Sequence, residues 1–175
     1  MERNTSSTSP DAGPVSGLVQ RWERAWNRHD MDDAASLVAP DVDFVNVAGL
    51  WLKGREEFLS WHRALHAMQM RRSVWTTLGS HARALHEGAW LAHVEWAIAG
   101  DLDLDGAPRQ PRRGHFMWVV RNGVEPHILA AQNTNLLARV AHRLNGGAHA
   151  PGECHAGTLL DPPSRLFSDA NGGHK

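Results

Sequence analysis

The stretch DVDFVNVAGLWLKGREEFLSWHRALH, residues 41–66, constrains the fold of this chain more than any other segment. Residues 41–47 alternate, with Phe44 on one face and Asp43 and Val45 on the other, which predicts a β-strand with apolar contacts on both sides. A glycine-marked connection follows. From Gly54 the apolar residues recur at helical spacing, after acidic residues that suit the start of a helix. The stretch therefore predicts a strand, a short return and a helix that packs over the strand.

Two further helices are predicted before this strand. The first covers residues 16–27, with Ser16 as its N-cap and an apolar face made of Leu18, Trp22, Ala25 and Trp26. The second is short: Asp30 caps it, Asp33 lies three residues further on, and Pro40 ends it.

After Ser73 the apolar period changes towards two. Strands are predicted at residues 73–85, 88–99, 112–121 and 126–135, and Asn122-Gly123 is a typical hairpin turn. Helices followed by a meander of long strands indicate an α+β fold, in which three N-terminal helices cover one face of a curved, mostly antiparallel sheet.

The acidic run that begins at Asp101 matches the first half of a calcium-binding loop, but Arg112 stands at the position of the bidentate glutamate. We therefore interpret the run as a hairpin loop.

Composition divides the chain into one domain and two tails. Residues 1–14 are rich in Ser, Thr and Pro and predict a disordered tail, while residues 139–175 are rich in Gly, Pro and His and predict a flexible one. The domain is expected over residues 15–138.

The charge and the cysteine content narrow the classes of partner. A net charge of −1 predicts neither a nucleic-acid nor a membrane partner. No apolar run approaches the ~20 residues of a membrane span, and no signal peptide is evident. The single cysteine, Cys154, fits a cytoplasmic protein. The 12 histidines supply groups that titrate near neutral pH, whereas the absence of tyrosine excludes a phenol donor.

Three segments resemble the bacterial SgcJ/EcaC family, within the nuclear transport factor 2-like (SnoaL-like, cystatin-like α+β cone) superfamily. They are AWNRHD at 25–30, DFVNVAGLWLKGREEF at 43–58 and ILAAQNT at 128–134. Trp96 and Gly100 are also similar, and the resemblance covers residues 15–138. It implies an α+β cone with a pocket for a small hydrophobic molecule, as in ketosteroid isomerase, scytalone dehydratase, limonene epoxide hydrolase and the SnoaL-type polyketide cyclases.

Asn46, His62 and His66 are the candidate catalytic residues. Asn46 is either a pocket amide or a structural amide bonded to backbone, and the resemblance favours the pocket. His62 and His66 lie one helical turn apart, but HRALH has Arg63 where a zinc protease has its general-base glutamate, so no metal is predicted. Two interpretations remain for these histidines: acid–base work in an apolar cavity, or one ring at the rim of the core and one in solvent.

The candidate substrate-binding residues are mostly aromatic. They are Trp51, Phe58, Trp96, Phe116, Trp118 and Asn133. Phe58 belongs to the predicted apolar face of the third helix, with Trp61, Leu65 and Met68. Phe116 and Trp118 share a face with Gly114, and the resemblance places Asn133 inward. Asp43 and Glu95 are expected to face outward, which argues against a carboxylate base.

Two functions fit these observations. The first is a cofactor-independent isomerase, cyclase or dehydratase that acts on a hydrophobic, polyketide-like carbonyl compound in natural-product metabolism, with His62 or His66 moving a proton. The second is a non-catalytic binding or accessory protein for a biosynthetic intermediate.

No nucleotide, flavin or haem motif is present, so no cofactor is expected. A homodimer is expected through the open sheet face, with contributions from Trp75, Met117 and Val119.

Overall fold

A computed structural model describes residues 13–136 of the chain as three helices and six strands. In order they are α1 (Gly13–Asn27), α2 (Met31–Ser36), β1 (Val38–Val45), β2 (Trp51–Lys53), α3 (Gly54–Ala67), β3 (Val74–His86), β4 (Ala89–Ala99), β5 (Arg112–Arg121) and β6 (His127–Asn135). The predicted C-terminal tail and residues 1–12 lie outside the described residues, whereas residues 13 and 14 already belong to α1.

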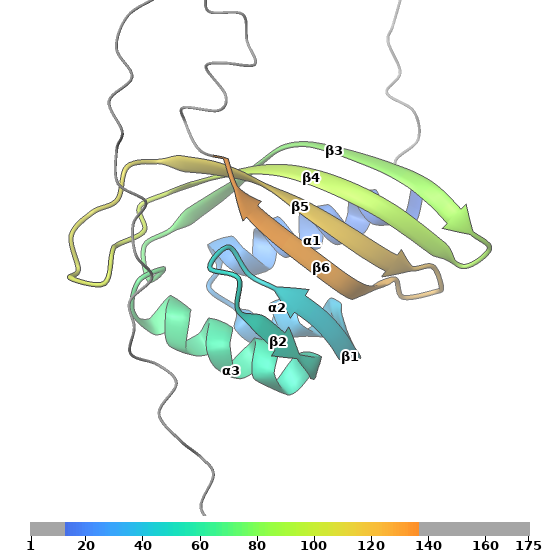
Figure 1. Cartoon of the computed structure of the whole chain (residues 1–175), viewed down its shortest axis with the longest axis horizontal. Coiled ribbons are helices and arrows are strands. Elements are labelled where there is room, and N and C mark those ends of the chain that lie inside the picture. The colour runs from blue at the N-terminus through green and yellow to red at the C-terminus, as the bar shows by residue number, and fades with distance from the viewer. Residues whose placement is uncertain (1–12, 137–175) are drawn as a thin grey trace, which may run out of the picture.

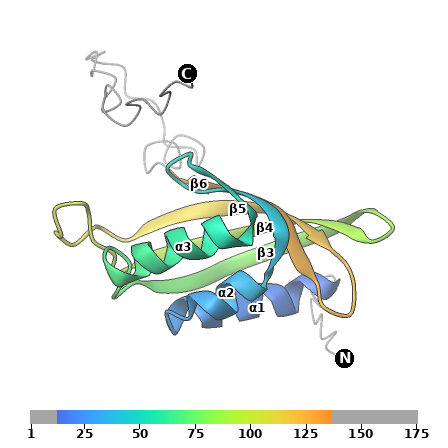
Figure 2. The ribbon, with the colours of Figure 1, turned by 90° about the horizontal axis from the view of Figure 1, so that it is seen from below.

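The six strands form one open, mixed sheet in the order β2-β1-β6-β5-β4-β3. All neighbours are antiparallel except β1 and β6, which run parallel. The sheet curves, and the three helices lie on its concave side (Figures 1 and 2). The predicted α+β cone is therefore confirmed, but the parallel pair is a feature that no local pattern indicated.

Several predicted boundaries differ from the structure. The helix α1 begins at Gly13, so Ser16 lies inside it rather than at its cap. The predicted cap of α2 is confirmed, because the Asp30 carboxylate accepts a 3.0 Å hydrogen bond from the Asp33 amide. That helix ends at Ser36, and Pro40 lies within β1 instead of ending the helix. The β1–β6 register shifts between Val38 and Asp43, and such an irregularity tolerates a residue that has no amide hydrogen.

The outer side of β1 is less buried than predicted. Val42 and Phe44 are buried as expected, but Asp43 is exposed and Val45 only half-buried, so β1 packs on one face. Glu95 on β4 is exposed like Asp43, as predicted.

An aromatic core fills the space between α1 and the concave face of the sheet. Trp22 is its centre, 2% exposed, and its ring lies 5.5–6.3 Å from the ring centroids of Trp26, Phe44, Phe58, Trp75, Phe116 and Trp118. Core packing was the predicted role of Trp22. The expectation that Trp75 lies on the open face is wrong: it is 1% exposed, because β3 begins at Val74 and the alternation turns Trp75 inward.

None of the helices in the described part of the chain is long and apolar enough to cross a membrane.

Candidate functional site

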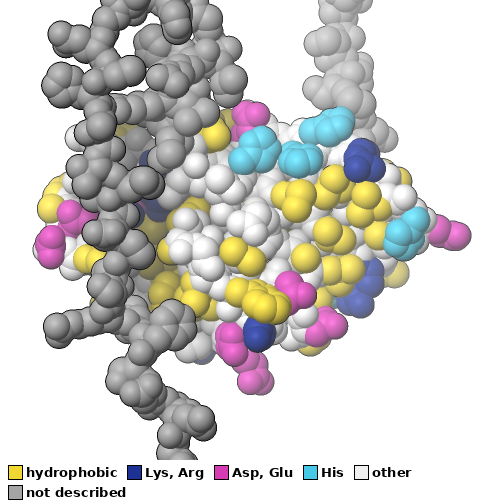
Figure 3. All heavy atoms as spheres, viewed as in Figure 1, with side chains coloured by type: hydrophobic (Ala, Val, Ile, Leu, Met, Phe, Trp, Pro, Cys, Tyr) yellow, Lys and Arg dark blue, Asp and Glu magenta, His cyan; other side chains and the backbone are white. Residues whose placement is uncertain are grey.

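A cavity of about 450 Å³ lies between α3, the concave face of the sheet and the β4–β5 connection. Its volume is typical of small-molecule sites. We call the part of the cavity that the β4–β5 connection and the start of β5 line its mouth. This connection approaches the C-terminal end of α3 (Figures 1 and 2), and the Leu102 amide donates to the Gln69 carbonyl there at 2.9 Å. Figure 3 shows apolar side chains inside a hollow at this end. Most of the wall is apolar, and five predicted site residues line it: Asn46, His62, Trp96, Phe116 and Asn133.

His62 reaches the cavity from the inner face of α3. The predicted apolar face of this helix is partly wrong, because Trp61 and Met68 are 39% and 58% exposed while Phe58, His62 and His66 are buried. The reason is tertiary: α3 docks on β1 through that row, with the Phe44 ring 4.9 Å from Phe58 and 5.4 Å from His62. The helix therefore buries its histidine row rather than its most apolar row.

His62 is neutral at physiological pH. Burial lowers the pKa of His62 to about 4, and the hydrogen bond to the Phe58 carbonyl opposes this shift only in part. Nδ1 lies 2.8 Å from that carbonyl oxygen. Because a carbonyl can only accept, Nδ1 carries the hydrogen and Nε2 keeps its lone pair. His62 thus presents a neutral hydrogen-bond acceptor to the cavity.

Asn46 combines the two roles considered for it. Its Oδ1 accepts from the amides of Ala48 at 2.9 Å and Leu50 at 3.0 Å, which holds the turn between β1 and β2. These bonds fix the orientation of the amide, and Nδ2 donates to no other described residue. The side chain also lines the cavity. Its carbonyl is therefore structural, and its NH₂ group is available to a ligand.

Asn133 supplies a second amide donor to the same cavity. Its Oδ1 accepts a 2.9 Å hydrogen bond from the Trp96 indole, which leaves Nδ2 without a partner among the described residues. Asn133 faces inward as expected, and Gln132 is exposed on the other face. The parallel register pairs Val45 with Gln132, so the end of β1 brings Asn46 beside Asn133. The pairing of β1 with β6 thus places both donors side by side in the cavity wall.

Three of the predicted substrate-binding residues do not line the cavity. Trp51 is 53% exposed, and its indole donates to the Asp43 carboxylate at 2.8 Å. The register pairs Val45 with Trp51, which turns Trp51 to the outer side of the sheet, so Trp51 does not line the cavity as a substrate-binding residue should. Phe58 and Trp118 are fully buried in the core around Trp22, behind the cavity wall.

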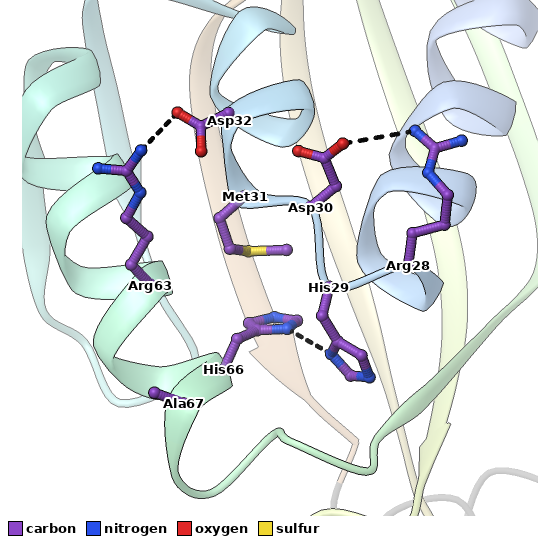
Figure 4. Close-up of a pocket in the computed structure, with 8 residues that line it drawn as sticks. All are labelled: Arg28, His29, Asp30, Met31, Asp32, Arg63, His66 and Ala67. Carbon is purple, nitrogen blue, oxygen red and sulfur yellow. Dashed lines mark hydrogen bonds and ion pairs between the residues drawn. The ribbon is translucent and has the colours of Figure 1, made fainter.

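His66 lies in a second hollow, separate from the cavity that His62 lines (Figure 4). Its ring points at the ring of His29 from the α1–α2 turn, with the two Nδ1 atoms 2.9 Å apart. Burial first, then repulsion by His29 and by His62, lowers the pKa of His66 to about 3. Of the two interpretations, work in the apolar cavity is therefore open to His62 alone, and neither ring lies in solvent. No group of three or more His, Cys, Asp or Glu side chains in the described residues is arranged to hold a metal ion.

Two arginines and an aspartate at the mouth were missed as site residues. Asp101 is fully buried, and its Oδ2 accepts from Arg112 Nε at 3.1 Å and lies 4.0 Å from Arg109. Arg112 also donates to Asn135 at 2.8 Å, and both arginines line the cavity. The alternation along β5 could have identified Arg112 as a site residue, because it places Arg112 on the inward face with Gly114 and Phe116.

Gly114 allows Trp96 to form part of the cavity wall. A Cβ atom at this position would overlap the Trp96 ring and lie 2.5 Å from the Thr134 carbonyl oxygen. Trp96 is fully buried and lies across β5 at this point. The glycine in RRGHFMWVV is therefore required for the packing of the aromatic wall.

Residues 19–124 match the family model of the SnoaL-like domain, and the chain belongs to this family. No match is found among curated proteins. Among solved structures, a cystatin-like protein of Caulobacter vibrioides superposes with a TM-score of 0.69 at 21% identity, over 74% of this chain and 92% of that one.

Two other similar structures carry more specific names. A ketosteroid isomerase-like protein from Erwinia carotovora atroseptica has a TM-score of 0.59 at 10% identity, over 74% of this chain and 99% of its own. Aln2 from a Streptomyces species has a TM-score of 0.61 at 12% identity, over 78% of this chain and 98% of its own. At these identities the likeness establishes the fold.

Proposed function

We propose that this SnoaL-like protein binds a hydrophobic, polyketide-like aromatic carbonyl compound and acts on it as a cofactor-independent isomerase, cyclase or dehydratase of natural-product metabolism. One observation carries the proposal: a neutral base, His62, and two amide donors, Asn46 and Asn133, line one otherwise largely apolar cavity. Large aromatic walls such as Trp96 and Phe116 suit a flat ligand. A neighbour in fold is named ketosteroid isomerase-like, a name that fits proton transfer next to a carbonyl.

The proposed reaction begins with proton transfer. His62 Nε2 takes a proton from the carbon beside the ligand carbonyl, and the electron pair of the broken C–H bond moves onto the carbonyl oxygen as an enolate. The NH₂ groups of Asn46 and Asn133 donate to that oxygen. His62 then returns the proton to another carbon of the conjugated enolate. In a cyclisation, the enolate carbon instead attacks a second carbonyl carbon of the ligand, the π pair of that carbonyl moves onto its oxygen, and His62 gives its proton to the alkoxide that forms. A base whose pKa is about 4 resembles the carboxylate base of ketosteroid isomerase in strength, so its low pKa is compatible with this step.

A second function, non-catalytic binding of a biosynthetic intermediate, is supported by a different observation. Acid–base enzymes often set two titratable groups with opposite pKa shifts in one cavity. Among the described residues that line this cavity, His62 is the single histidine and no carboxylate accompanies it. The same cavity would then hold the intermediate without converting it.

Hydrogen exchange of an aromatic ketone separates the two functions. We expect the protein to accelerate deuterium incorporation at the carbons beside the carbonyl of 2-tetralone, followed by proton NMR in D₂O. His62→Gln should slow the protein-dependent exchange by about 100-fold or more, because general-base catalysis contributes on that order.

The matched control for this experiment is His93→Gln. His93 is exposed on the outer face of β4, so its replacement should leave exchange unchanged. Binding of 2-tetralone without any acceleration would exclude the catalytic function for this class of ketone and support the binding protein. Acceleration that survives His62→Gln would remove the role assigned to His62.

We also propose a homodimer that covers the outer face of the sheet. Met117 is 42% exposed and Val119 half-buried on that face, and Figure 3 shows apolar side chains gathered over β5 and β6. Continuous apolar patches on a sheet commonly mark an interface. Sedimentation equilibrium should give twice the mass of the chain, and Met117→Glu should shift the protein to monomer. A monomeric wild-type protein would contradict the proposal.

Within the SnoaL-like family we assign the chain to the SgcJ/EcaC branch. The segments that carry this resemblance contribute Asn46 and Asn133 to the cavity. Flanking genes for polyketide or enediyne biosynthesis are expected, and flanking genes of primary metabolism alone would oppose the assignment.

A cytoplasmic location is proposed from the single cysteine, and recovery in the periplasmic fraction of cells would contradict it.

A further inference from the structure

We propose that the molecule held in the cavity is an anion whose carboxylate docks on Arg112 and Arg109 at the mouth, while its carbonyl reaches the amide donors within. This inference rests on the proposed function, because it concerns the ligand of the same cavity. It adds a carboxylate to that ligand, a group that the fold alone does not specify. It depends on the charge balance of the mouth, on the geometry of Arg112 and on the uncharged amide donors beside it.

The mouth carries an unbalanced positive charge. Arg109 and Arg112 both line the cavity, and among the described residues Asp101 is the one carboxylate that pairs with them. None of the other described lining residues is acidic. Two guanidinium groups against one carboxylate leave one net positive charge, in a place where apolar walls weaken the screening by water. An anionic group on the ligand would neutralise this charge.

Arg112 is held in an orientation that suits a carboxylate. Its Nε donates a hydrogen bond to Asp101 Oδ2 at 3.1 Å, and its Nη1 donates to Asn135 Oδ1 at 2.8 Å. Its Nη2 donates to no described residue. The guanidinium carbon lies 5.5 Å from the centre of the Trp96 ring, which forms the cavity wall. An arginine whose position is fixed in this way loses little conformational freedom when it binds an anion.

Arg109 supplies the second part of the docking site. It lies on the β4–β5 connection, its side chain is 41% exposed, and its distance of 4.0 Å from Asp101 shows only a loose ion pair. The guanidinium can therefore turn to a ligand carboxylate without breaking a short hydrogen bond. Together with Nη2 of Arg112 it provides the charge-assisted donors that carboxylates favour.

The amide donors lie near Arg112 but carry no charge. Asn133 accepts from the indole of Trp96, the ring that Arg112 approaches, and Asn135, two residues further along β6, accepts from Arg112. We therefore expect the ligand to place its carboxylate on the two arginines, its aromatic body against Trp96 and Phe116, and its carbonyl oxygen on Asn46 and Asn133.

A pair of matched probes tests the inference. We expect 2-naphthoate to bind the wild-type chain about tenfold or more tightly than its neutral isostere 2-naphthamide, measured by calorimetric titration. Arg112→Gln and Arg109→Gln should each reduce that preference several-fold and leave the affinity for 2-naphthamide nearly unchanged. Arg113→Gln is the matched control, because Arg113 is the exposed neighbour on the opposite face of β5 and should keep the full preference.

The outcomes are distinct. Equal affinity for the two probes would overturn the anionic ligand while leaving an apolar cavity and the proposed function intact, whereas binding of neither probe would count against both. An equal loss of preference in Arg113→Gln would also overturn the inference, because general charge would then explain it. Should Arg112→Gln unfold through loss of the Asp101 partner, seen by circular dichroism, Arg109→Gln decides the outcome, since that side chain is partly exposed and loosely paired.

Discussion

Replacement of Trp22 by alanine should lower the free energy of unfolding by about 3–5 kcal/mol, the range for removing a large aromatic side chain from a core. Trp22 is 2% exposed and packs against six other aromatic rings contributed by α1, β1, α3, β3 and β5. Such a site cannot collapse easily, because its neighbours are large rings held by several different elements. Urea denaturation followed by circular dichroism measures the loss.

Trp51→Ala is the matched control, since it removes the same side chain from the surface. Trp51 is 53% exposed and contributes one hydrogen bond to Asp43 and a cation–π contact in which Lys53 Nζ lies 4.4 Å from its ring. Exposed contacts of this kind contribute about 1 kcal/mol or less. Equal losses for the two variants would show that Trp22 is not the centre of the core.

The free energy of unfolding should also fall by about 2–3 kcal/mol between about pH 7.5 and pH 4.5 on account of His62 alone. The pKa of His62 is about 4 in the fold against its ordinary value of 6.5. Between these values the unfolded chain binds a proton that the folded protein does not. The contribution of His62 is thus fully present above about pH 6.5 and is lost as the pH falls through 4. Burial of His66 acts in the same direction.

Urea titrations at a series of pH values measure this dependence. His62→Gln should remove a large part of the slope between about pH 6.5 and pH 4.5, with His66 responsible for what remains. His93→Gln should leave the slope unchanged, because His93 is exposed on the outer sheet face. A slope that is the same in His62→Gln and in the wild type would contradict the burial of a neutral His62.

The positions of the long strands followed from local sequence patterns. The predicted range 112–121 coincides with β5, and the other long strands begin and end within one residue of the predicted bounds. The period of two that identifies a strand is a property of the backbone and needs no tertiary information. The same applies to the cap of α2, since Asp30 and Asp33 are three residues apart.

The site was predicted less completely, because its membership depends on contacts between distant segments. Asn46 and His62 lie in one stretch and were found together, and the resemblance supplied Asn133. Arg112 was missed because its partner Asp101 is eleven residues away, across a connection whose path no periodicity describes. Trp51 was misplaced because its orientation depends on the register of β2 with β1.

The sequence by itself determined which segments are helices and strands, which glycines mark the turns, and that the architecture is α+β. Only the tertiary structure decided that β1 pairs in parallel with β6, that α3 buries its Phe58–His62–His66 row, and that His62 and His66 face different hollows. The physical reason is that periodicity reports the geometry of one segment. The face that becomes buried depends on the surface against which that segment docks, and that surface comes from distant parts of the chain.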